Sequence, residues 1–256
     1  MALLGGVVAD GLLRFFDAEA SEPRVAEPGD ARSRLEMLFG AGVLERIAGR
    51  RVLDFGCGNG SDAVAIALGG ARMVVGLDIL EAGLQRGRAA AARHGVAGRC
   101  SFVTQWDQPM DVILSIDAFE HFADPAAILR TMSGLLAPGG KVLLSFGPTW
   151  FHPLGGHLFS VFPWSHLLFT EAALMRWRAR YRNDGARRFA ECEGGLNQMT
   201  IARFERLVDE SPLRLDALET VPIRRLRKLH GHWSREFTTS LVRAGLSARE
   251  PAAAAA

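Results

Sequence analysis

The sequence predicts an α/β fold in which helices cover both faces of a mostly parallel sheet. The chain has 256 residues, of which 48% are hydrophobic and 23% are charged, the balance of a globular protein with a sizeable core. Between residues 51 and 146, short apolar runs alternate with helical patterns. This βαβαβαβ order requires parallel strands, because each helix returns the chain to the edge where the next strand begins.

The first 50 residues predict a helical cap or lid that precedes the main domain, residues 51–250. Residues 1–29 are rich in glycine and proline and give no clear element. Asp30 can cap a helix whose apolar positions follow the 3.6-residue period. These positions are Leu35, Leu38, Phe39 and Ile47.

The alternating segment predicts five strands and three helices. The strands are expected at 51–55, 73–78, 101–104, 111–116 and 141–146, and the helices at 60–69, 81–95 and 125–136. Asp124 and Pro125 suit the cap and the first turn of the last helix. A turn at 137–140, Ala-Pro-Gly-Gly, leads into the fifth strand.

The alternation ends at Phe146. Residues 147–170 are rich in aromatic residues, proline, glycine and histidine and show no obvious element. Helices are expected at 171–182 and 200–210, and strands at 213–221 and 237–246. The terminal Pro-Ala tail, 251–256, is of low complexity and is expected to be disordered.

The strongest functional signal is VLDFGCGNG at residues 52–60. A strand runs into a turn in which Gly56, Gly58 and Gly60 let a ligand approach the backbone closely. The G-x-G-x-G spacing differs from the G-x-G-x-x-G fingerprint of dinucleotide-binding proteins. Asp54 precedes the turn and can meet a cationic group, whereas Asp78 ends the next strand and suits the two hydroxyls of a ribose.

At these residues the chain resembles the class I S-adenosylmethionine-dependent methyltransferases, of the small-molecule type. Four segments match the family's motifs in order and spacing over about residues 51–146. They are VLDFGCGNG, VVGLDIL, DVILSIDAFEHFADP and LLAPGGKVLLSF. The resemblance implies a Rossmann-like, seven-stranded, mostly parallel sheet, with S-adenosyl-L-methionine as the cofactor and methyl transfer as the reaction.

The resemblance also implies the cofactor contacts. Asp54 and the backbone of Gly56, Cys57 and Gly58 would face the methionine portion of the cofactor. Asp78 would bind the ribose.

On the adenine side, the resemblance implies that Ile79 packs against the ring. The family often has a Gly-Asp pair after the third strand, whose acid meets the adenine amine. This chain has TQWDQPMD there, which is shorter than usual. Gln105, Trp106 and Asp107 all stay open as the residue that takes this place, and Trp106 could instead belong to the core.

The fourth strand would end beside the reacting methyl group. The resemblance places Ser115, Ile116 and Asp117 near the amino group and sulfonium of the cofactor. Because the methyl carbon is already activated, the protein mainly has to align the acceptor, although a hydroxyl or carbon acceptor also needs a base. We expect the catalytic residues to be Asp117, His121 and His157. His152, His166 and Glu171 stay open as further candidates for the base.

Residues 147–212 are expected to form an insertion on the acceptor side of the site. Six Phe and Trp residues lie between positions 150 and 169, and they could line an apolar acceptor pocket or pack between the core and the C-terminal helices. His152, His157 and His166 could in principle form a metal site. No cysteine or carboxylate pattern accompanies them, so we expect no metal.

The expected function is transfer of a methyl group to a small or lipid-like organic acceptor, with an oxygen atom slightly favoured over nitrogen or carbon. Three alternatives stay open: a nucleic-acid methyltransferase, a non-catalytic cofactor-binding module, and a dinucleotide oxidoreductase, whose nicotinamide fingerprint is missing here. Residues 172–256 carry 16 basic and 10 acidic residues, an excess that suits either an anionic partner or a solvated surface. Because no nucleic-acid motif accompanies it, we do not expect nucleic acid as a partner.

The location of the protein is also suggested by composition. Cys57, Cys100 and Cys192 lie far apart and form no C-x-x-C pair, which favours reduced thiols. No apolar run approaches the roughly 20 residues needed to span a bilayer. We therefore expect a cytoplasmic protein without a membrane span, and the sequence gives no signal for an oligomeric state.

Overall fold

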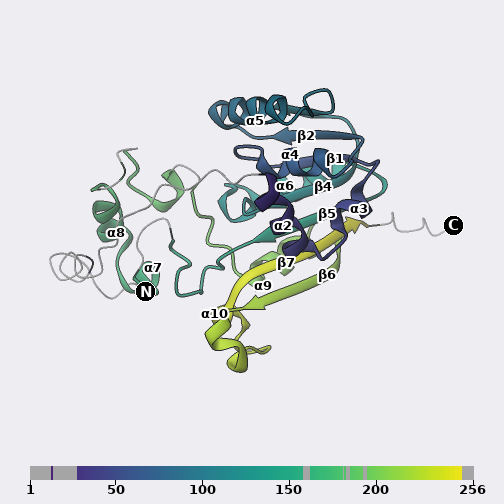
Figure 1. The fold of residues 1–256 in the computed structure, drawn as a ribbon. Coiled ribbons are helices and arrows are strands. Elements are labelled where there is room, and N and C mark those ends of the chain that lie inside the picture. Colours follow the sequence, from purple (N-terminus) through teal and green to yellow (C-terminus); the bar gives the residue numbers. More distant parts are fainter. Residues whose placement is uncertain are drawn as a thin grey trace.

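The computed structural model describes residue 13 and residues 28–157, 162–180, 182, 185–192 and 195–249 (Figure 1). At its centre is a seven-stranded sheet in the order β3-β2-β1-β4-β5-β7-β6. Strands β1 to β5 are parallel to one another, and β7 is antiparallel to both β5 and β6. The predicted Rossmann-like, mostly parallel sheet is therefore confirmed.

Strands and helices alternate along the chain from β1 to β3 and from β4 to β5, whereas no helix separates β3 from β4. The strands are β1 (Arg51–Phe55), β2 (Met73–Leu77), β3 (Cys100–Val103), β4 (Met110–Ile116), β5 (Leu136–Phe146), β6 (Leu213–Pro222) and β7 (Thr239–Ala248). The α-helices are α2 (Pro28–Phe39), α3 (Val43–Ile47), α4 (Ser61–Leu68), α5 (Glu81–Arg93), α6 (Pro125–Gly134), α7 (Ser165–Leu168), α8 (Glu171–Arg178), α9 (Ile201–Asp209) and α10 (Arg235–Thr238). Three short 3₁₀ turns are η1 (Phe119–His121), η2 (Phe189–Glu191) and η3 (Arg224–Leu229). In the part of the chain that the structure describes, no helix is long and apolar enough to cross a membrane.

Helices cover both faces of the sheet, because neighbouring residues of a strand point to opposite sides. Val52 of β1 packs in one cluster with buried residues of α2, α3, α4 and α5. Leu53, the next residue, packs in a second cluster with buried residues of α6 and α9. The parallel strands are therefore buried on both faces, which explains why they read as continuous apolar runs rather than as alternating patterns.

The single helix expected between Asp30 and Ile47 is wrong. The structure has two helices there, and α2 already begins at Pro28. Gly40 and Gly42 separate them with φ angles of 88° and 77°, a left-handed conformation that ends a helix. The boundaries of the expected lid (1–50), domain and insertion stay predictions, and most of residues 1–27 and the tail 251–256 lie outside the described residues.

Several element ends also differ from the prediction. Residues 137–140, expected as a turn, lie within β5, which starts at Leu136 and pairs with Met110. The pairing then jumps to Val112 with Lys141, so the extra residues form an irregularity in the strand, with Gly139 at a φ of 75°. The segment without an expected element contains the short helix α7. The last strand begins two residues later than expected, because α10 precedes it.

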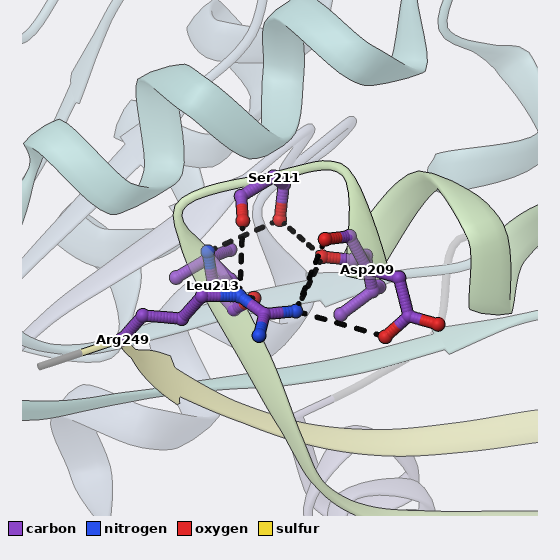
Figure 2. Close-up of polar contacts among 5 residues, drawn as sticks. Asp209, Ser211, Leu213 and Arg249 are labelled. Atoms are coloured by element: carbon purple, nitrogen blue, oxygen red, sulfur yellow. Dashed lines mark hydrogen bonds and ion pairs between the residues drawn. The ribbon is translucent and has the colours of Figure 1, made fainter. Parts of the chain in front are cut away.

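Arg249 ties the end of β7 to the turn between α9 and β6 (Figure 2). Its Nε donates to the carbonyl oxygens of Ser211 at 3.2 Å and Leu213 at 2.8 Å. Its Nη2 donates to the carbonyl of Asp209 at 3.1 Å and forms an ion pair with the Asp209 carboxylate at 3.6 Å. The Asp209 carbonyl ends α9 and the Ser211 carbonyl follows it, where the last carbonyls of a helix lack helical partners. One guanidinium thus fixes the antiparallel pair β6–β7 at the edge of the sheet where β7 ends.

The ring of Phe102 in β3 fills a space that three glycines leave open beneath the loop after β1. A Cβ atom on Gly60, Gly76 or Gly87 would lie only 2.3–2.5 Å from ring atoms of Phe102. The three glycines belong to the loop, to β2 and to α5, respectively. The packing of one buried ring therefore sets how closely α5 and the glycine-rich loop approach the sheet.

We expect Gly87→Ala to destabilise the fold by about 1–3 kcal/mol, the usual cost of forcing an extra methyl group into a packed core. Alanine improves the helix propensity by about 1 kcal/mol, but here the contact with Phe102 outweighs that gain. Gly134→Ala is the matched control, since it also lies in a helix but has open space around its Cα. Urea unfolding should show a loss for Gly87→Ala and an equal or higher stability for Gly134→Ala. A gain in both variants would contradict the packing argument.

Candidate active site

The glycine-rich loop lies at the carboxyl edge of the sheet, between β1 and α4. Gly56, Gly58 and Gly60 have φ angles of 81°, 54° and 77°, which side chains rarely allow. The backbone N–H groups of Gly56 and Cys57 donate to the carbonyl of Leu77 at 2.8 and 3.0 Å, so the loop is held against the end of β2. The Cys57 side chain is buried in the core, and burial raises the pKa of its thiol.

Asp78 and Ile79 follow β2 and lie next to this loop. The Asp78 carboxylate accepts hydrogen bonds from the backbone N–H groups of Gly58 at 2.8 Å and Leu80 at 2.9 Å. Ile79 is 88% exposed, although it is a large apolar side chain. An acid held beside the glycine loop and an uncovered apolar side chain after it suit a ribose and an adenine ring.

Four charged groups meet beside the loop. Asp54 in β1 is buried, and Asp62 is buried in the first turn of α4. Arg34 of α2 forms an ion pair with Asp62 and a hydrogen bond with Asp117 at 3.3 Å. Burial and the neighbouring Asp62 raise the pKa of Asp54 well above its usual range, while Arg34 opposes this shift. Among the described residues, the site therefore holds more carboxylates than its single arginine can neutralise.

Arg34 and Asp62 were not identified from the sequence. They are 28 residues apart and belong to different helices, so only the packing of α2 on α4 brings them together. A weak signal does exist for Asp62, because this charged residue directly precedes the apolar stretch Ala63–Ala67, all of which is buried. An acid in such a position needs a partner.

The end of β4 presents Ser115, Ile116 and Asp117. Ser115 and Ile116 are buried, and the Ser115 hydroxyl has no partner within the described ranges. Asp117 has a φ of 49°, and its N–H donates to the carbonyl of Ser145 at 3.0 Å. This uncommon left-handed conformation turns the chain sharply at the strand end. Partial burial raises the pKa of Asp117, and Arg34 counteracts the shift.

His121 and His157, two of the expected catalytic residues, are close together. Their ring centroids are 5.9 Å apart in an edge-to-face arrangement. The Nδ1 atom of His121 lies 2.6 Å from the carbonyl oxygen of Gly195. Because a carbonyl only accepts, Nδ1 carries the proton, and Nε2 of the neutral ring can accept one. His157 is accessible to solvent, but protein atoms lie close around its ring. Desolvation and the neighbouring His121 lower the pKa of the ring to about 4.

The two other histidines of the segment after β5 make local hydrogen bonds. Nε2 of His166 lies 2.5 Å from the carbonyl of Trp150, and Nδ1 of His152 accepts from the N–H of Leu154 at 2.9 Å. Burial lowers the pKa of both rings. Among the residues that the structure describes, no group of three or more His, Cys, Asp or Glu could hold a metal ion.

The aromatic residues of this segment divide between packing and exposure. Trp150 and Phe162 pack against the cluster around α8, and Phe169 is buried within it. Trp164, by contrast, is 37% exposed. The expectation of an acceptor pocket here stays a prediction, and the structure shows that part of the segment serves packing.

The partner of the adenine amine also stays a prediction. Trp106 packs against the core, and its indole N–H donates to the carbonyl of Gln108 at 2.8 Å. Gln105 and Asp107 are exposed, and Asp107 accepts from the side-chain amide of Gln108. Trp106 is therefore partly a core residue, one of the two possibilities that the sequence left open.

Glu120, beside His121, is a further buried acid that was not identified as a site residue. One carboxylate oxygen accepts from the N–H of Gly147 at 3.1 Å, and the other has no partner in the described part of the chain. Burial raises the pKa of Glu120 to about 7. The carboxyl group is therefore protonated in mildly acidic solution.

We expect Glu120→Gln to stabilise the protein at pH 8 but hardly at all at pH 4.5. The folded state holds the proton up to a pKa of about 7, whereas an ordinary Glu releases it at 4.5. The folded state thus loses stability as the pH rises between these values, by about 3 kcal/mol in total. Glutamine cannot ionise and escapes this loss. Urea unfolding at both pH values checks this, with exposed Glu210→Gln as the control, and a variant effect independent of pH would contradict the assignment.

The residues at this edge fit an S-adenosylmethionine molecule. The Oδ2 atom of buried Asp54 and the hydroxyl of Ser115 lack partners in the described residues and can meet the amino group. A Cβ atom on Gly58 would have open space around it, so the backbone is accessible there. The exposed Ile79 can cover one face of the adenine ring. The carboxylates suit a ligand that carries an ammonium group and a sulfonium.

Comparisons with known proteins agree with this geometry. A family model described as "Methyltransferase domain" matches residues 6–211. A ubiquinone biosynthesis O-methyltransferase of Neisseria meningitidis serogroup C is 38% identical over 106 residues, which cover 39% of this chain and 44% of that protein. A ribosomal protein L11 methyltransferase of Photobacterium profundum is 35% identical over 100 residues, 39% of this chain and 34% of that protein. The chain thus matches less than half the length of these relatives.

A solved structure shares the fold over most of the chain. The magnesium protoporphyrin IX methyltransferase of Synechocystis PCC 6803 aligns with a TM-score of 0.51 and 17% identity, covering 93% of this chain and 94% of that chain. The family model covers well over half of the sequence. The chain therefore belongs to the family of methyltransferase domains, and its fold is that of the class I S-adenosylmethionine-dependent methyltransferases.

Proposed function

We propose that the protein transfers a methyl group from S-adenosylmethionine to a hydroxyl group of a small or lipid-like organic acceptor. The observation that carries the proposal is the pair of rings at the carboxyl edge of the sheet, His121 and His157. His121 presents an acceptor nitrogen because its other ring nitrogen is bound to Gly195. A hydroxyl acceptor needs such a base, whereas an amine or thiolate often does not. Curated relatives named ubiquinone biosynthesis O-methyltransferase support an oxygen acceptor.

Different residues of the chain would bind the cofactor and accept the proton. When bound, the cofactor supplies an activated methyl group on its sulfonium. Asp54 and Ser115 would hold the amino group, and Asp78 the ribose, so that the methyl group faces the acceptor side. His121 would accept the proton at Nε2 as the acceptor oxygen forms its bond to the methyl carbon and the carbon–sulfur bond breaks. The products are a methyl ether and S-adenosylhomocysteine.

Incubation with a methyl-labelled cofactor tests the proposal. The purified chain is mixed with extracts of metabolites and lipids, with total RNA and with ribosomal protein, and each fraction is analysed by mass spectrometry. We expect the label on an organic hydroxyl, and none without the chain. Label on RNA or protein, or tight cofactor binding without turnover on any fraction, would replace the proposal by one of the alternatives.

Arg34 gives a separate prediction about the cofactor. Its guanidinium forms ion pairs with Asp62 and Asp117. We infer that it also donates a hydrogen bond to the cofactor's carboxylate. Arg34→Gln should weaken S-adenosylmethionine binding about tenfold, the effect of one charged hydrogen bond. Arg32→Gln is the matched control, because that arginine of the same helix forms only exposed ion pairs with Glu36 and Glu45.

Methylthioadenosine shows whether Arg34 contacts the carboxylate of the cofactor, since this ligand has the nucleoside and the sulfur but no amino acid portion. Calorimetry should show that Arg34→Gln leaves the affinity for methylthioadenosine unchanged. An equal loss for both ligands would mean that Arg34 acts by holding the fold, through buried Asp62, and would contradict a direct contact.

A further inference from the structure

The connection between β6 and β7 projects beyond the sheet at the edge that carries the active site. It comprises residues 223–238, with η3 and α10, and is called the β6–β7 tip here. β6 ends at Pro222, which pairs with Thr239, while Val242 pairs with Phe146 at the end of β5. Because β5 ends at the carboxyl edge, the tip lies on the same side as the glycine loop. Figure 1 shows α10 at the outer end of the yellow strand pair, on the side of α7 and α8.

Large apolar side chains are exposed on this tip. Trp233 is 94% exposed, Leu229 67% and Phe237 48%. The ring of Phe237 lies 5.3 Å from that of Phe151, which follows β5. The tip therefore contacts the acceptor-side segment, while Trp233 and Leu229 remain uncovered. Apolar groups that gather on a surface in this way are typical of interaction sites.

The same tip carries uncompensated positive charge. Arg224, Arg225, Arg227 and Lys228 are exposed, and none has an acidic partner among the residues that the structure describes. The nearby acid Glu236 is not available to them, because its two oxygens accept from the N–H groups of Ile201 and Ala202. Arg235, the fifth cation, is neutralised by both carboxylate oxygens of Glu205. Within the described ranges, four cations without an acidic partner thus adjoin the exposed apolar side chains.

We propose that the β6–β7 tip docks the enzyme on the surface of an anionic lipid bilayer. Tryptophan and leucine beside a cluster of arginine and lysine are the composition of interfacial membrane contacts: the apolar groups enter the headgroup region and the cations meet lipid phosphates. A nucleic acid would use the cations and could stack on Trp233, but it has no use for the exposed aliphatic chain of Leu229. The charge and the apolar chemistry together favour lipid.

This inference deepens the proposed function, because docking would bring the acceptor side of the site to the membrane. The tip touches the segment after β5 through Phe237 and Phe151. An acceptor with a hydrocarbon tail could then reach the site from the bilayer without crossing water. The binding itself can be measured independently of methyl transfer.

Vesicle sedimentation with the full chain tests the docking. Vesicles of phosphatidylcholine with about one third phosphatidylglycerol should bind the protein, whereas pure phosphatidylcholine should bind much less. Raising the salt from about 0.1 M to about 0.5 M should weaken the binding, because the cations are exposed. Equal binding to both vesicle types, or no binding to either, would overturn the proposal.

Variants assign the binding to the tip. Arg227→Gln with Lys228→Gln should weaken it about 25-fold, since each cation near an anionic surface contributes about fivefold. Trp233→Ala should weaken it about tenfold by removing apolar contact. The controls are Arg86→Gln with Arg93→Gln on α5 and Leu68→Ala at the end of α4, which remove two exposed cations and an exposed apolar side chain elsewhere. If the control variants lose as much vesicle binding as the tip variants, the binding does not depend on the tip and the proposal fails.

Two further measurements separate the outcomes. RNA added at equal phosphate concentration should not displace the protein from vesicles, and preferred binding to RNA would mean that the tip serves nucleic acid. Calorimetry with S-adenosylhomocysteine should give one affinity for the wild type and the tip variants. Vesicle binding with intact cofactor affinity but no lipid-like substrate would refute only the proposed acceptor, whereas absent vesicle binding with an active enzyme would refute only the docking.

Discussion

Replacement of His121 by asparagine is expected to lower kcat by about 10²–10³-fold without changing the affinity for S-adenosylmethionine, because the base is lost while the fold is kept. The side-chain amide of asparagine can still donate to the carbonyl of Gly195, as Nδ1 of His121 does. It offers no basic nitrogen at the place of Nε2. The variant therefore separates a catalytic His121 from a merely structural one, for which a retained hydrogen bond would preserve the rate.

His157→Gln is the comparison, and the pH profile distinguishes the two rings. A general base works only when it is unprotonated, so the rate falls as the pH drops below its pKa. Burial and His121 hold the pKa of His157 at about 4, so a reaction that uses His157 would lose rate only near pH 4. A loss of rate in His157→Gln with His121→Asn fully active would reverse the assignment. Full activity of both variants would mean that the acceptor needs neither ring.

The parts of the site that follow from local sequence were predictable. The glycine loop and Asp78 each lie directly after a strand, and the carboxyl ends of parallel strands meet at one edge. The parallel arrangement of strands β1 to β5 followed from the alternating pattern. The positive φ angles of Gly56 and Gly58 confirm that the spacing of glycines encodes the shape of the loop.

The remaining parts depend on contacts between distant segments. Gly195 lies 74 residues from His121, and no local pattern indicates that its carbonyl sets the proton position on that ring. Arg34 reaches Asp62 and Asp117 only because α2 packs on α4. Such pairings are decided by tertiary packing. The break between α2 and α3 was visible in principle, since two glycines flank Ala41, but the apolar period on both sides concealed it.

The surplus of carboxylates explains how one site can serve a cofactor with two positive groups. Asp54, Asp62 and Asp117 surround Arg34, and burial raises the pKa of all three. A bound ammonium and sulfonium would favour the ionised forms and reverse these shifts. Cofactor binding should therefore release protons from the site. The same groups disfavour an anionic nucleotide, which agrees with the absence of the dinucleotide fingerprint from the loop.

Asp78→Ala is expected to weaken the binding of S-adenosylmethionine and S-adenosylhomocysteine equally, by about 2–3 kcal/mol, or roughly 30- to 150-fold. Two ribose hydroxyls lose a charged acceptor, and each hydrogen bond to a charged group is worth about 1.5–3 kcal/mol before the rearrangement of the site is counted. The carboxylate also accepts from the N–H groups of Gly58 and Leu80, so its loss loosens the loop as well.

Asp78→Asn distinguishes these two contributions, because its amide oxygen can still accept from a backbone N–H but carries no charge. We expect it to recover part of the affinity. Methylthioadenosine should lose as much as S-adenosylmethionine in Asp78→Ala, since it has the same ribose, whereas Arg34→Gln should spare it. Calorimetry with the three ligands measures this pattern. If methylthioadenosine binds Asp78→Ala as tightly as the wild type, Asp78 does not hold the ribose. Competition by NADH as strong as that of S-adenosylhomocysteine would then point to a different ligand for the whole edge.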